Sequence, residues 1–238
     1  MVIALTRRDI LAIAGLSSVC GCPVLAQSTA PAVDENHPDF FSPDIPDLVS
    51  QGTDPALGPE VQKALELISK APTGGMVIDV MSYLEGLTDK NIDNEFYNAG
   101  WRTRWNPVIV TFFTATHTKP SGDVTPWCAA CVNWCLARVG YLGTGSAVSG
   151  SFRSVPGQTG APQKGDIVVF RNTNDAEARV GRGHVALFLE QNADSIFVLG
   201  GNQKNSFGHH AVCRKWIPKS DGTLTFHSYH SIAALRGG

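Results

Sequence analysis

The hydrophobic pattern of this chain changes its period at Gly165, and this change constrains the fold more than any other feature. Before Gly165 the apolar residues recur at helical spacing, as in Val61, Leu65 and Ile68. After Gly165 they form short runs bounded by turn residues, which is typical of strands. Helices followed by a meander of strands predict an α+β fold rather than a doubly wound parallel sheet.

Capping residues mark the predicted helices. Asn106 followed by Pro107 predicts a short helix to about residue 116, although the segment VIVTFF also has strand propensity. Thr125 followed by Pro126 predicts a second helix start, and this helix should end near Val139. We also expect helices over 59–70 and 76–87, loops over 143–162 and 171–182, and strands over 166–170, 184–190, 196–199 and 211–216.

Residues 1–26 have the features of an export signal. Arg7 and Arg8 precede a weakly apolar stretch, and residues 24–26 resemble a signal-peptidase site. The two arginines lie in a sequence that resembles a twin-arginine motif, so we expect export of the folded protein to the periplasm or beyond. Two alternatives remain open: a buried amphipathic helix, and a lipid anchor at Cys22, which lies in a near match to a lipoprotein box.

The remaining sequence divides into three segments. Residues 27–58 are rich in Pro and Gly and predict a linker or arm, residues 59–105 predict a helical region of unknown role, and residues 106–238 predict the catalytic domain.

The formal charge of −2 over 238 residues excludes a general nucleic-acid binder. No uninterrupted apolar run reaches the roughly 18 residues that a membrane-spanning helix needs.

Four cysteines follow the predicted signal, and three of them lie close together. Cys128, Cys131 and Cys135 share one stripe of the helix predicted after Thr125. A helix cannot easily join its own cysteines, so we expect no two-disulfide framework, and any structural disulfide should involve Cys213. Three thiols spread along one helix are also too far apart to bind one metal ion, so we expect no metal site.

Cys128 is the candidate nucleophile. If Thr125 is the cap, Cys128 is the third residue of its helix, where free N–H groups and the helix dipole favour an anion. We therefore expect a lowered thiol pKa, and we expect the same N–H groups to stabilise an oxyanion. The alternative is that Cys128 is a small core residue, as we expect for Cys131 and Cys135.

A cysteine nucleophile needs a base, and His184 is the strongest candidate. It opens an apolar strand directly after Gly183, whereas the other six histidines, including His209 and His210, lie in polar stretches or in the linker. The alternative is a surface histidine without a catalytic task.

The predicted hairpin after His184 supplies a polar partner. If the two strands pair about a loop centred on Ala193, Leu187 faces Leu199 and Leu189 faces Phe197. In the same register His184 faces Asn202, and the two side chains come within hydrogen-bond reach. A shift by one residue would place Asn202 on the other face, and turn chemistry in Gly-Gly-Asn is the alternative explanation for Asn202.

Four ordered segments resemble the CHAP group of cysteine- and histidine-dependent amidohydrolases and peptidases, within the NlpC/P60, papain-like set. They are PWCAACVNWCL (126–136), GDIVVF (165–170), GHVA (183–186) and LGGNQ (199–203). The resemblance covers about residues 106–216 and implies a nucleophile helix packed on an antiparallel sheet.

The same resemblance implies a function. Cys128 would be the nucleophile, His184 the base and Asn202 the third polar residue, and no metal or organic cofactor would be required. The substrate would be an amide bond of cell-wall peptidoglycan, cut by an amidase or an endopeptidase. We also expect Trp127, Gln203 and Asn205 to line a substrate groove, with core packing as the alternative for Trp127.

Two other classes of protein compete with this interpretation. The WCAAC sequence at 127–131 resembles a thioredoxin-like redox motif at a helix start. However, a dozen residues containing Pro120 and Gly122 separate it from the candidate strand VIVTFF, and a redox role leaves His184 and Asn202 unused. A non-catalytic cell-wall-binding module is the other alternative, and it predicts that binding does not depend on Cys128.

Overall fold

In the computed structural model, which describes residues 54–236, most of the helices precede the sheet along the chain. The helices are α2 (Gly58–Ser69), α3 (Val77–Glu85), α4 (Pro107–Phe112), α5 (Cys128–Arg138) and α6 (Asp175–Arg179), with 3-10 turns at η3 (Phe113–Ala115), η4 (Gly122–Val124), η5 (Ser149–Ser154) and η6 (Ile232–Leu235). The strands are β1 (Gln158–Thr159), β2 (Ile167–Asn172), β3 (Gly183–Gln191), β4 (Ser195–Lys204), β5 (His210–Pro218) and β6 (Leu224–His230). The predicted signal and most of the predicted linker lie outside the described residues.

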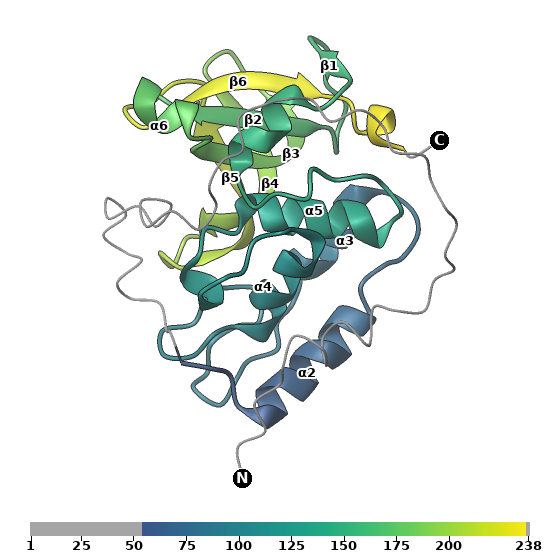
Figure 1. Ribbon diagram of the computed structural model, residues 1–238, viewed down its shortest axis with the longest axis vertical. Coiled ribbons are helices and arrows are strands. Elements are labelled where there is room, and N and C mark those ends of the chain that lie inside the picture. The colour runs from purple at the N-terminus through teal and green to yellow at the C-terminus, as the bar shows by residue number, and fades with distance from the viewer. Residues whose placement is uncertain (1–53, 237–238) are drawn as a thin grey trace.

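The six strands form one antiparallel sheet in the order β1-β6-β2-β3-β4-β5. Figure 1 shows this sheet in the upper part of the molecule, with α5 beneath it and α2 and α4 on the opposite side of α5. The α+β fold with a helix packed on an antiparallel sheet is therefore confirmed.

Both faces of the central strands are buried, which explains their continuous apolar sequence. Val185 and Leu187 of β3 face the core that contains α5. Ala186 and Phe188 point the other way, into a second cluster that includes Tyr229 of β6. The sheet curves, so that β5 and β6 come into contact although they are not neighbours in the sheet.

The predicted hairpin register is correct near the centre of the sheet and wrong toward the loop. Leu187 pairs with Leu199, as predicted, but a bulge at Leu189 makes Glu190 the partner of Phe197. The bulge arises because one extra residue of β3 is left unpaired. The pairing of β3 with β4 begins at Leu187, so His184 lies beyond it and pairs only with Phe170 of β2.

Two further predictions need correction. Residues 224–230 form β6, which we did not predict because its polar residues His227, Ser228 and His230 hide the strand pattern. The predicted polar loop 171–182 begins with the end of β2 and contains α6, which the Asn174 side chain caps by accepting the N–H groups of Ala176 and Glu177. None of the helices within residues 54–236 is long and apolar enough to cross a membrane.

The helical region before residue 106 shares its hydrophobic core with the sheet. Leu67 of α2, Met81 of α3 and Trp101 belong to the same buried cluster as Leu187. Arg138, at the end of α5, donates to the carbonyl oxygens of Ile68, Ser69 and Ala71 at the end of α2. A cation is favourable there because the free carbonyls of a helix end carry partial negative charge.

One buried carboxylate holds the segment before α4 against the segment before α5. Asp123 is fully buried, and its Oδ2 accepts the backbone N–H groups of Trp101 at 3.1 Å and Asn106 at 2.9 Å. Asn106 in turn caps α4 by accepting the N–H of Val108 at 2.9 Å, as predicted. Burial raises the pKa of Asp123 to about 7.

We predict that Asp123→Ala lowers the free energy of unfolding by about 2–4 kcal/mol, because two buried N–H groups lose their acceptor. Asp123→Asn keeps an acceptor oxygen and serves as the matched control. A raised carboxyl pKa means that the parent loses stability relative to Asp123→Asn as pH rises from about 4 to about 7. Urea unfolding at pH 5 and pH 8 measures both effects, and an Ala variant as stable as the parent would contradict the assignment.

Candidate functional site

Cys128 is the first residue of α5 rather than the third. The N-cap is Trp127, and the predicted cap Thr125 instead accepts the backbone N–H of Ser121 at 2.9 Å. The correction leaves Cys128 in the first turn of the helix, where the N–H groups lack partners within the helix. Its thiol lies against the backbone N–H of Val185, the residue that follows His184.

The thiol of Cys128 is buried, and burial decides its acidity. Only 6% of the residue is exposed. Burial raises the pKa of the Cys128 thiol to about 11, while the backbone N–H groups of Val185 and Ala129 act in the opposite direction. The predicted lowering of this pKa is therefore wrong for the free protein, because desolvation of the thiolate outweighs the helix start.

His184 reaches the site because glycine precedes it. A Cβ on Gly183 would lie 2.2 Å from the carbonyl oxygen of Phe170 on β2, so only glycine fits there. The His184 imidazole is itself buried, and burial lowers its pKa to about 4. Lys215 and His210 act in the same direction, whereas hydrogen bonding to Gln203 raises the pKa. Thiol and imidazole are thus both neutral at pH 7.

Gly200 and Gly201 allow β4 to lie close to the first turn of α5 and to the side-chain amide of Gln203. A Cβ on Gly201 would lie 2.6 Å from the ring of Trp127 and 2.8 Å from Cβ of Cys131, so β4 packs directly on the first turn of α5. A Cβ on Gly200 would lie 2.8 Å from Nε2 of Gln203. The missing side chains therefore make room for the helix on one side and for the Gln203 amide on the other.

Gln203 is buried beside His184 and is not a groove residue. Its Nε2 donates to the carbonyl oxygens of Gly200 at 2.9 Å and Cys213 at 2.7 Å. This fixes the amide, so Oε1 is the atom left for the imidazole. Gln203 Oε1 and His184 Nε2 are both buried, and neither atom has a hydrogen-bond partner among the described residues.

Asn202 takes a different place from the one predicted. Its Oδ1 lies 2.9 Å from Nδ1 of His210, and its backbone has a φ of +58°. This left-handed conformation, which Asn tolerates better than most residues, falls where the pairing of β4 with β5 shifts between Gly200 and Gln203. The positive φ of Asn202 thus coincides with the register shift directly before Gln203.

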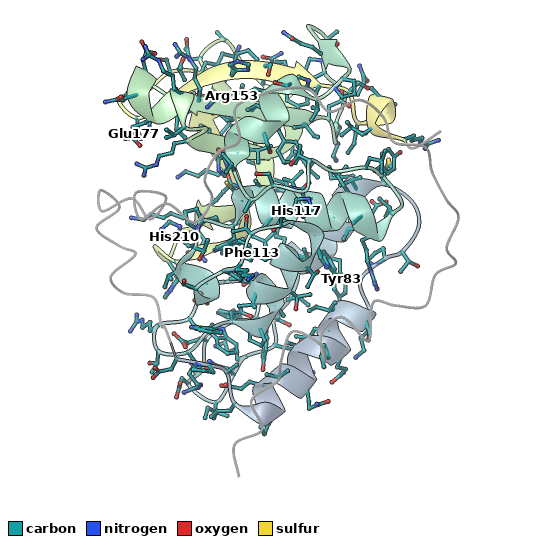
Figure 2. The ribbon with its side chains drawn as sticks, viewed as in Figure 1. Tyr83, Phe113, His117, Arg153, Glu177 and His210 are labelled. Carbon is teal, nitrogen blue, oxygen red and sulfur yellow. The ribbon has the colours of Figure 1, made fainter. Side chains whose placement is uncertain are left out.

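His210, which lies in a polar stretch of the sequence, contacts Asn202 in the structure. It begins β5 opposite Lys204, and its Nε2 is buried without a partner among the described residues. Figure 2 shows its side chain at the junction between the sheet and the helical part of the molecule. Asn205 and Gly208 in the sequence indicate a turn, and this turn brings the chain back to the end of β4. The position of His210 near this end of the strand could have been predicted from these turn residues.

The other two predicted groove residues differ from one another. Trp127 is buried against Phe112, with ring centroids 5.9 Å apart, so it is a core residue. Asn205 lines a pocket of about 500 Å³, and its Oδ1 accepts the N–H groups of Phe207 and His209.

Three further cysteines follow Cys128 in the described part of the chain. Cys131 and Cys135 are buried core residues, as predicted, and Cys128, Cys131, Cys135 and Cys213 are all free thiols. Within residues 54–236 no group of three or more His, Cys, Asp or Glu side chains could hold a metal ion.

Comparison with known proteins identifies one family. The family model of the CHAP domain matches residues 120–202, which include α5, β2, β3 and most of β4. The search of curated proteins and the search of solved structures each returned no match. CHAP domains are typically hydrolases that act on peptidoglycan. Residues 120–202 of this chain are therefore similar to the CHAP domain, whose papain-like build agrees with the fold described above.

Proposed function

We propose that this protein is an exported cysteine hydrolase that cleaves amide bonds in peptidoglycan, with Cys128 as nucleophile and His184 as base. One observation carries the proposal: the Cys128 thiol starts α5 directly against the backbone of the strand that bears His184. Covalent amide hydrolysis by a cysteine needs a base close to the thiol, and this contact brings the Cys128 thiol to the residue that directly follows His184.

The reaction begins from the neutral pair. Cys128 Sγ attacks the amide carbonyl carbon while its proton passes to His184, so no separate thiolate–imidazolium pair has to form in the buried site. Free N–H groups of the first turn of α5 stabilise the oxyanion. His184 then protonates the leaving amine, the C–N bond breaks, and water hydrolyses the thioester to release the acid and restore the thiol.

Gln203, rather than Asn202, is proposed to orient the imidazole. Its Oε1 can only accept a hydrogen bond, so it favours a proton on Nε2 of His184. The opposite ring nitrogen, Nδ1, is then unprotonated and can take the proton of Cys128. Asn202 contributes indirectly, since it fixes the backbone that delivers Gln203.

A redox function has less support. A resolving cysteine must reach the sulfur of Cys128, but the Cys131 thiol is fully buried and is hydrogen-bonded with Cys135. The proposal also places the enzyme outside the cytoplasm after cleavage of residues 1–26. A mature protein that begins elsewhere, or that never leaves the cytoplasm, would contradict this part.

The function is tested by digestion of purified peptidoglycan, with products identified by mass spectrometry, beside reduction of insulin disulfides. Cys128→Ala should abolish digestion because the nucleophile is gone. Cys131→Ala, the matched control one helical turn along, should cost about 1 kcal/mol of stability and keep most activity. Insulin reduction that is lost in both variants, with no digestion by the parent, would overturn the proposal.

Two substitutions, one at Gln203 and one at Asn202, distinguish the roles of these residues. Gln203→Ala should lower kcat roughly 100-fold, because the imidazole loses its preferred tautomer. Asn202→Gly should stay within about threefold of the parent, since glycine adopts a positive φ without strain. Steady-state kinetics on a soluble peptide substrate measures both, and a larger loss for Asn202→Gly than for Gln203→Ala would reverse the assignment.

The neutral pair predicts how Cys128 reacts with iodoacetamide. Because burial raises the thiol pKa, the alkylation rate should rise about tenfold per pH unit from pH 7 to pH 9. A thiol with a lowered pKa would instead react at a constant rate over this range. Subtracting the rate of Cys128→Ala removes the contribution of Cys213, and a plateau at neutral pH would show that the pair is ionised.

A further inference from the structure

A pocket at the turn between β4 and β5 is lined entirely by residues outside the CHAP match. Its volume is about 500 Å³, which lies in the range of small-ligand sites. One wall is the segment 90–103, and the other is the turn 205–209 between β4 and β5. Neither wall falls within residues 120–202, so the matched family does not supply this pocket.

Backbone hydrogen bonds fix the first wall to the strand that carries His210. Gly100 donates to the carbonyl oxygen of His210 at 2.8 Å, and Val212 donates to the carbonyl oxygen of Asn98 at 2.8 Å. Gly100 and His209 both line the pocket, and the next residue, His210, contacts Asn202. A lining residue of the pocket, His209, is therefore the direct neighbour of His210, whose side chain contacts Asn202 of β4.

Both carboxylates of this wall accept hydrogen bonds, whereas neither of its two cations pairs with a carboxylate. Asp93 pairs with Arg104 at 2.7 Å, and Glu95 accepts the backbone N–H of Arg102 at 2.9 Å. Lys90 donates to the amide oxygen of Asn94 at 2.9 Å and lies over the Phe96 ring, 4.4 Å from its centroid. Among the described residues, neither Lys90 nor the Arg102 side chain forms an ion pair, so two positive charges are available to a ligand.

The pocket also exposes aromatic surface. Phe207, at the tip of the turn, is 80% exposed, and Phe96 on the facing wall is 40% exposed. Large exposed aromatic side chains around a hollow mark binding sites more often than random surface does. Two cations without an ion pair and two exposed aromatic rings in one pocket match a peptide ligand that carries carboxylates and apolar groups.

We propose that this pocket binds the peptide part of the substrate by its carboxylates, with Lys90 and Arg102 as the charge partners and Phe207 as an apolar contact. This inference rests on the proposed function, because it assigns a substrate feature to that same site. It also gives residues 90–103 a role: they select peptides with free carboxylates, while Cys128 and His184 perform the cleavage.

Binding is tested on the full chain carrying Cys128→Ala, so that no hydrolysis occurs. The probe is the tetrapeptide Ala-Glu-Lys-Ala, compared by calorimetry with the same peptide in which both carboxyl groups are amidated. We expect the acidic form to bind about tenfold tighter, with each cation contributing about three- to fivefold. Lys90→Gln with Arg102→Gln should remove this difference, whereas Lys164→Gln, which removes an exposed lysine outside the pocket, should keep it.

Kinetics of the active enzyme separate the two proposals. The Lys90→Gln, Arg102→Gln variant should raise KM for the acidic peptide and leave kcat nearly unchanged, since the cations lie away from the reacting bond. If the parent digests peptidoglycan but binds acidic and amidated peptides equally, the pocket assignment is overturned and the hydrolase stands. If the acidic peptide binds as expected but the parent cleaves no peptidoglycan, the proposed function fails instead.

Discussion

The close packing of β4 on the first turn of α5 is the contact on which the site depends. Gly201 has no side chain, so the strand backbone approaches Trp127 and Cys131 directly. This contact holds the start of the helix against the sheet and sets where the Cys128 thiol lies relative to β3. A larger residue at Gly201 would move strand and helix apart, and the thiol would lose its place beside the backbone of Val185.

Burial, rather than the helix dipole, governs the chemistry of the pair. Desolvation opposes the thiolate of Cys128 and the imidazolium of His184 alike, so both groups rest in their neutral forms. In the proposed mechanism, the sulfur therefore attacks the substrate carbonyl at the same time as its proton moves to His184. The same burial makes the orientation of His184 important, because a neutral imidazole is a base at only one nitrogen.

The helical segment before residue 106 is an integral part of the fold that carries the site. Its side chains share the core of the sheet, and its last residues are hydrogen-bonded to β5. Asp123 links the same segment to the chain that leads into α5. The pocket wall and the start of α5, where Cys128 lies, are thus connected through short hydrogen bonds.

The sequence alone predicted the α+β fold, the cap at Asn106, the Leu187–Leu199 pairing and the candidates Cys128 and His184, because these depend on local periodicity, capping chemistry and residue type. It did not predict the bulge at Leu189 or the contact of Asn202 with His210. It also did not predict that Gln203, and not Asn202, lies beside the His184 imidazole. Those features follow from a positive φ and from close approaches at glycines, which depend on how distant strands meet. The pKa of the Cys128 thiol could not be predicted either. The sequence indicates that Cys128 lies near a helix start, but the thiol is desolvated only because the sheet covers that helix in the folded protein.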